Sequence, residues 1–135
     1  MVKRIIILFT VLFLLTSCNK GHRFDFRFIE NQSLYQGAVE EILRNTSETP
    51  ESYSLSEIEQ HSDTTSFKNT IKLFKEFKIS LVSKRKQSVS FHYHYRYMFN
   101  NRKKVLIYNY NNPFMYDNFI YEIEKIYNDN WCEAK

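Results

Sequence analysis

The sequence predicts a small α+β domain, and three observations lead to this prediction. Two segments carry apolar residues at helical spacing, and a later region alternates apolar with polar residues at the period of two that strands show. The chain has 135 residues, a length that suits one domain with a single modest core. We therefore expect an antiparallel β-meander with about two helices packed on one of its faces.

The first elements of the domain are a predicted strand and a predicted helix. Phe24, Phe26 and Phe28 alternate with charged residues, which favours a half-buried strand. The next stretch, residues 33–45, has apolar side chains at helical spacing, and Ser33 is its expected N-cap. These apolar residues are Leu34, Ala38, Ile42 and Leu43.

Residues 46–65 are rich in Ser, Thr and Glu and predict a loop, with a short helical turn at 55–60. A loop of this length is unusual in a compact domain, so it either has a function or contains a further element. The second predicted helix covers 66–77. Its apolar stripe, which we interpret as a core face, is Phe67, Ile71, Phe74 and Phe77.

The region 88–99 is the clearest predicted strand, and 79–83 and 105–110 flank it as its partners. Polar turns are expected at 84–87 and 100–103. One face of the central strand is aromatic and is expected to lie under the helices: Phe91, Tyr93, Tyr95, Tyr97 and Phe99. The other face is polar: Ser90, His92, His94, Arg96 and Met98.

The C-terminal segment 119–127 fits both a helix and a strand. We interpret it as a strand, with Trp131 and Cys132 closing the sheet. Cys132 is then expected to be buried as a small apolar group. The alternative is a thiol that pairs with another molecule.

The N-terminus has the parts of a secretory signal peptide. Lys3 and Arg4 precede an apolar run over 5–15, and Thr16 and Ser17 follow it. This run is too short to span a bilayer, which requires about 20 residues. We expect an export signal.

The four residues Leu15-Thr16-Ser17-Cys18 resemble the lipobox of bacterial lipoproteins. The resemblance implies cleavage before Cys18, a diacylglycerol on the Cys18 sulfur and an acyl chain on the new N-terminus. Two or three acyl chains anchor a protein stably. The expected organisation is a signal peptide at 1–17, a short tether at 18–22 and one globular domain at 23–135. The alternatives are an ordinary cleaved signal with a chance cysteine, and an uncleaved N-terminal helix.

The resemblance also implies a location. Neither an aspartate nor an acidic run follows Cys18, so the expected site is the cell envelope, at the outer membrane facing the periplasm. The expected partners are the membrane, through the lipid, and an envelope protein. The formal net charge is +4, and two of these charges belong to Lys3 and Arg4 in the signal, so little supports nucleic-acid binding. If Cys18 carried no lipid, a disulfide between Cys18 and Cys132 would become possible.

His92 and His94 are the candidate metal ligands, because residues two apart on a strand point to the same side. A third ligand would come from His22, His61 or a carboxylate, and no H-E-x-x-H or C-x-x-C motif is present. The simpler interpretation is a solvated strand face. We assign no metal site, no cofactor-binding residue and no cofactor beyond the lipid expected on Cys18.

Catalytic motifs are absent from the sequence. There is no G-x-S-x-G, and the adjacent His61, Ser62 and Asp63 cannot converge as a triad. Three pairs of acids are interpreted as solvated faces, although the second lies in the long loop and could form a carboxylate site: Glu40 with Glu41, Glu57 with Glu59, and Glu122 with Glu124. The basic triplets 84–86 and 102–104 are interpreted as charged hairpin turns.

Tyrosine is abundant, with ten in the chain. These rings either fill the core or form an exposed recognition face; the C-terminal ones are Tyr108, Tyr110, Tyr116, Tyr121 and Tyr127. Two function classes follow. The first is a lipid-anchored, non-catalytic binding module, and the second is a small envelope metal-binding protein or hydrolase that uses His92 and His94. We assign no catalytic residue.

Overall fold

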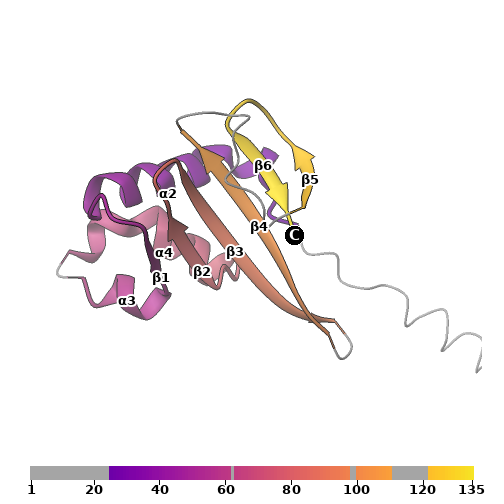
Figure 1. The fold of residues 1–135 in the computed structure, drawn as a ribbon. Coiled ribbons are helices and arrows are strands. Elements are labelled where there is room, and N and C mark those ends of the chain that lie inside the picture. The colour runs from indigo at the N-terminus through magenta and orange to yellow at the C-terminus, as the bar shows by residue number, and fades with distance from the viewer. Residues whose placement is uncertain (1–24, 62, 98–99, 111–121) are drawn as a thin grey trace, which may run out of the picture.

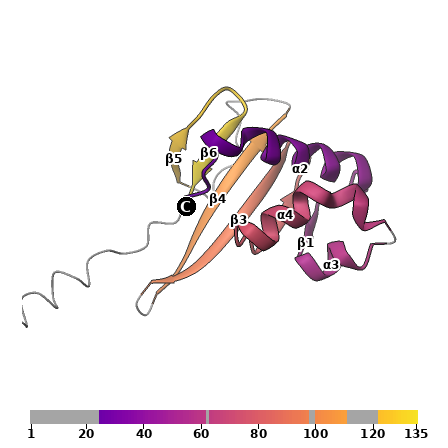
Figure 2. The same cartoon turned by 180° about the vertical axis from the view of Figure 1, so that it is seen from behind.

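The computed structural model describes residues 25–61, 63–97, 100–110 and 122–135, and it confirms the α+β class. One antiparallel sheet of six strands has the order β1-β2-β3-β4-β6-β5. The helices cover one face of this sheet (Figures 1 and 2). The predicted signal peptide, Cys18 and the predicted tether lie outside the described residues.

The helical elements are η1 (Ile29–Asn31), α2 (Gln32–Asn45), α3 (Leu55–Glu59), η2 (Thr64–Phe67) and α4 (Lys68–Glu76). The strands are β1 (Glu51–Tyr53), β2 (Leu81–Lys84), β3 (Ser88–Tyr97), β4 (Asn100–Asn109), β5 (Ile123–Ile126) and β6 (Trp131–Ala134). No helix within the described residues is long and apolar enough to cross a membrane.

The predicted strand at Phe24–Phe28 is wrong for the residues that the structure describes. Arg27 has a φ of 48°, and its backbone N–H donates to Asp25 Oδ1 at 2.9 Å. This left-handed residue interrupts an extended chain, so the alternation never enters the sheet. Phe26 and Phe28 are nevertheless buried, and Tyr35 on α2 holds the segment by donating its hydroxyl to the Phe26 carbonyl at 2.8 Å.

The two predicted helices are confirmed, with changes at their first turns. α2 begins at Gln32 after η1, and Ser33 is not its N-cap. The second predicted helix is divided into η2 and α4. The core face of α2 is shifted relative to the predicted stripe, because Tyr35 and Val39 are buried while Leu34 and Leu43 are only partly buried.

The long predicted loop contains a further element, as its length suggested: a strand that no periodicity indicated. β1 lies at the edge of the sheet and pairs antiparallel with β2, with Tyr53 opposite Val82. Its three residues are too few to show a periodicity. The predicted helical turn is confirmed as α3, and Ser54 and Glu57 form a capping box at its start.

The predicted meander is confirmed as β2, β3 and β4, but the last hairpin is longer than expected. Residues 100–103 were predicted as a turn and belong to β4, where Lys103 pairs with His94. The strand interpretation of the C-terminal segment is confirmed for β5, and residues 119–121 lie outside the described part. β6 pairs with both β4 and β5, so it lies between them.

The sheet has a buried residue set on each face. Phe91 and Leu106 are paired neighbours on the helix side and join the main core. The opposite face carries a second buried cluster formed by Val105, Ile107, Cys132 and Ala134. Cys132 is a buried thiol, as the sequence predicted.

Several charged residues expected at turns or solvated faces have structural contacts instead. Lys84 lies in β2, is buried, and donates from Nζ to Thr46 Oγ1 at 3.2 Å and to the Ser47 carbonyl, just beyond the end of α2. Lys104 lies in β4 and forms ion pairs with Glu133 at 3.2 Å and Glu124 at 3.3 Å. The predicted basic turn at 102–104 is therefore corrected, because cross-strand pairing extends β4 into it. Of the triplet 84–86 only Lys84 belongs to a strand, and Arg85 and Lys86 lie in the predicted turn between β2 and β3.

Candidate functional site

His92 and His94 lie on the same side of β3, but their environments differ. His94 is exposed, whereas His92 is only 7% exposed and its Nε2 lies 3.1 Å from Ser90 Oγ. Burial, together with the positive charges of His94, Arg85 and Lys103, lowers the pKa of His92 to about 4. The expected solvated face is therefore wrong at His92, which is a neutral buried imidazole at pH 7.

The structure does not bring His61 to this pair. Its ring packs against Phe67, with the two ring centroids 5.1 Å apart, and it borders a hollow beside β1 and α3. His22 lies outside the described residues. Within the described part of the chain, no group of three His, Cys, Asp or Glu residues could hold a metal ion.

The hollow beside β1 and α3 has a volume of about 400 Å³ and contains the acids of the long segment. Its carboxylates already have partners. Glu57 accepts from the backbone N–H and hydroxyl of Ser54, and Glu51 accepts from the Tyr53 hydroxyl. These hydrogen bonds lower the pKa of both carboxyl groups. We interpret these acids as helix and strand-end contacts rather than as a carboxylate site.

The C-terminal tyrosines that the structure describes do not form an exposed recognition face. Tyr108, Tyr110 and Tyr127 are each partly buried. The Tyr127 hydroxyl donates to Glu133 at 2.7 Å, and the Tyr110 hydroxyl donates to the Lys86 carbonyl at 2.6 Å. Tyr116 and Tyr121 lie outside the described residues.

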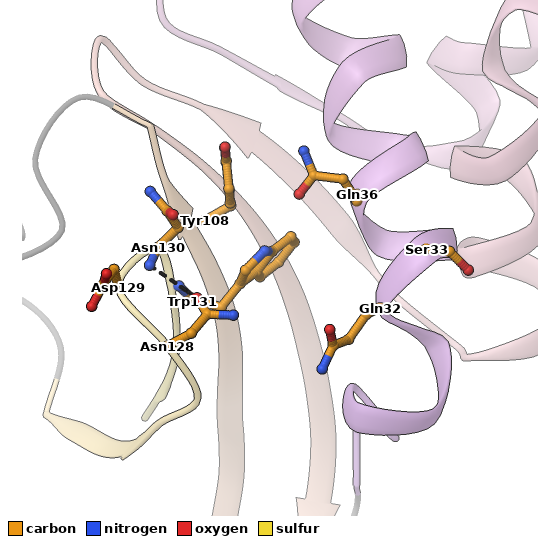
Figure 3. Close-up of a pocket in the computed structure, with 8 residues that line it drawn as sticks. All are labelled: Gln32, Ser33, Gln36, Tyr108, Asn128, Asp129, Asn130 and Trp131. Atoms are coloured by element: carbon orange, nitrogen blue, oxygen red, sulfur yellow. Dashed lines mark hydrogen bonds between the residues drawn. The ribbon is translucent and has the colours of Figure 1, made fainter.

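A second hollow, of about 450 Å³, lies between the start of α2 and the turn that joins β5 to β6 (Figure 3). We name it the amide cleft, because four of its lining residues are carboxamides. It is lined by Gln32, Ser33, Gln36, Tyr108, Asn128, Asp129, Asn130 and Trp131.

One wall of the amide cleft is the β5–β6 turn, whose shape is fixed by its own asparagines. Asn128 Oδ1 accepts from the backbone N–H groups of Asn130 and Trp131, both at 3.0 Å. Asn130 Nδ2 donates to the carbonyl of Asn109 on β4 at 2.9 Å. Asn side chains stabilise tight turns by such bonds, so this wall is fixed before any ligand arrives.

The other wall is the first turn of α2. Gln32 and Gln36 are four residues apart, which places them on one side of a helix. Figure 3 shows both side chains on the side of α2 that faces Trp131. Neither carboxamide has a hydrogen-bond partner among the described residues, so each offers a donor and an acceptor to the cleft.

Trp131 forms the floor. It is 4% exposed, and its ring contacts Phe28 and Tyr108 with centroid distances of 4.7 and 5.0 Å. In Figure 3 its side chain extends from β6 toward α2, into the space between the two walls. Its indole N–H has no acceptor among the described residues, although a buried indole usually has one. Trp131 therefore brings a buried indole donor to the lining of the amide cleft.

The amide cleft carries little charge. Asp129 is the one formally charged residue among those that line it. Its volume lies within the range of small-molecule sites, about 300–1,000 Å³. An aromatic floor with convergent neutral donors and acceptors suits an uncharged polar ligand better than an ion.

Sequence patterns missed this site because its residues come from three distant segments. Only Trp131 and Tyr108 carried a signal, as aromatic residues with a polar group. No protein-family model, curated protein or solved structure matches the chain.

Proposed function

We propose that this chain is an acylated lipoprotein of a bacterial cell envelope, anchored through Cys18 at the outer membrane facing the periplasm. Support for the anchor comes from the residues before Cys18, where a charged start and a short apolar run lead into Leu15-Thr16-Ser17. The domain behind this anchor acts as a binding module and not as an enzyme.

The amide cleft is the observation that carries the binding role. Its fixed turn, its buried indole N–H and its two glutamines, which have no hydrogen-bond partner among the described residues, are groups that hold a ligand in one orientation. A hydrolase needs a nucleophile and a base within hydrogen-bond reach of each other. No such pair occurs among the residues that line this cleft.

The second candidate is a small metal-binding protein or hydrolase that uses His92 and His94. It rests on two imidazoles on one side of β3 and requires a further ligand from outside the described residues. Metal analysis of the untagged protein separates the candidates. Stoichiometric zinc or copper that is lost in the His92→Ala, His94→Ala double variant would replace the binding role with this one.

The anchor is tested by the intact mass of protein isolated from membranes of its native host. We expect the mass of residues 18–135 plus acylated glycerol, and a Cys18→Ala variant that remains in the aqueous fraction. An unmodified mass, or a membrane-bound Cys18→Ala variant, would overturn the anchor.

A further inference from the structure

We propose that the amide cleft binds a small uncharged saccharide of the cell envelope. This inference deepens the proposed function and rests on it for the location of the ligand.

The polar groups of the cleft match hydroxyl groups. Each sugar hydroxyl both donates and accepts, and a carboxamide does the same through its NH₂ and its oxygen. Gln32 and Gln36 lie one helical turn apart and have no partners within the described residues, so together they can bind neighbouring hydroxyls on one sugar ring.

The buried indole supplies the fixed point of the site. Trp131 donates but cannot accept, and its buried ring packs against Phe28 and Tyr108 at the lining of the cleft. A sugar oxygen that accepts from this N–H would supply a hydrogen bond that no described residue provides, and leaving a buried donor unpaired is costly. The partly buried ring of Tyr108 adds an apolar surface, which suits the C–H groups of a sugar.

Charge narrows the class of ligand. Asp129 is the one formal charge on the lining, so a phosphate or carboxylate would lack a cationic partner there and would meet a like charge. A cationic ligand would find only this single exposed carboxylate. Uncharged sugars with one to three rings are the ligands that fit both the volume of about 450 Å³ and this charge.

The sequence provides a direct readout, because Trp131 is the single tryptophan. We would titrate the acylated protein in a zwitterionic detergent, since a sugar-based detergent would compete. The probes are triacetylchitotriose, maltotriose and an uncharged acetylated trialanine amide. We expect a saturable change in Trp131 emission with at least one saccharide and none with the peptide.

Two matched variants decide whether the cleft is the site. Gln36→Ala removes a cleft carboxamide and should weaken binding about tenfold, the effect of losing one hydrogen bond to a buried partner. Gln60→Ala removes an exposed carboxamide after α3 and should bind as the unaltered protein does. A response to triacetylchitotriose alone would indicate an amino-sugar glycan, whereas a response to maltotriose would indicate a neutral hexose polysaccharide.

The proposal is overturned by no saturable response to either saccharide, by a response to the peptide alone, or by unaltered binding in Gln36→Ala. These outcomes are independent of the anchor. If the mass carries acylated glycerol and no saccharide binds, the ligand assignment fails while the lipoprotein proposal stands. If the mass shows no lipid and saccharide binds, the lipoprotein proposal fails while the ligand assignment stands.

Discussion

Glu41 on α2 accepts two hydrogen bonds from Thr70 on α4, from its backbone N–H and its hydroxyl, both at 2.8 Å. The other oxygen of the carboxylate accepts from the N–H and Nδ2 of Asn69, also at 2.8 Å. The N-cap residue of α4 is Phe67, whose side chain makes no capping hydrogen bond. Glu41 therefore takes the place of a capping residue from another helix, and its charge suits the positive end of α4.

Replacing Glu41 with Ala should lower the free energy of unfolding by about 2 kcal/mol, because two backbone N–H groups lose their acceptor next to the buried Thr70. Urea unfolding measures this loss. Glu40→Ala is the matched control: this neighbour is exposed and its loss should change stability by less than about 0.5 kcal/mol. Equal effects of the two variants would contradict the interhelical cap.

Gly37→Ala should fail to stabilise α2, although Ala is favoured over Gly in helices by about 1 kcal/mol. A Cβ on Gly37 would lie 2.6 Å from Asn69 Nδ2, and the Asn69 amide cannot move away without losing its hydrogen bond to Glu41. We expect Gly37→Ala to destabilise the protein in urea unfolding.

The control for this prediction is the same substitution in an Asn69→Ala background. Without the amide the clash is gone, so Gly37→Ala should there stabilise the protein by about 0.5–1 kcal/mol. A stabilising effect of the same size in both backgrounds would show that the close contact has no energetic weight.

Stability should fall as pH falls from about 6.5 to about 4 because of His92. Its pKa is near 6.5 when unfolded and about 4 when folded, so the unfolded chain binds more protons in this window and acid favours unfolding. The stabilisation that comes from neutral His92 is fully present above pH 6.5 and amounts to at most about 3 kcal/mol.

The measurement for His92 is urea unfolding at several pH values, compared with His92→Gln. The variant should show a shallower fall between pH 4 and 6.5, since carboxylates titrate in both proteins. His61→Gln, which alters an exposed histidine, is the matched control. If the free energy of unfolding of His92→Gln followed pH in parallel with that of the unaltered protein, protonation of the buried imidazole would not destabilise the fold, and the prediction would be wrong.

Cys132 should resist thiol reagents in the folded protein, because its side chain is fully buried in β6. In acylated protein, where lipid blocks Cys18, we expect no labelling by a bulky disulfide reagent before denaturation and one thiol afterwards. Labelling at the same rate with and without guanidinium would contradict the burial of this strand.

The sequence alone was sufficient to predict the helices and strands whose formation depends on residues close together in the chain. The apolar spacing of α2 and α4 and the alternation in β3 are local patterns, and the structure follows them because each element buries its own apolar face. The export signal and the lipid on Cys18 are also predictions from local sequence, and they await the mass measurement. The alternation of Phe24, Phe26 and Phe28 before α2 led to a wrong strand prediction, because Arg27 turns the chain before a strand can form.

The remaining features depend on contacts between distant segments, which no local pattern encodes. Glu41 and Thr70 are 29 residues apart, and only the packing of α2 on α4 converts a predicted solvated acid into a helix cap. His92 lies on the polar side of an alternating pattern, which predicts an exposed side chain, yet the fold buries it. The amide cleft exists because β6 lies between β4 and β5 and brings Trp131 opposite Gln32 and Gln36. Burial and hydrogen-bond partners are set by the whole chain, so tertiary structure alone decided where chemistry is possible.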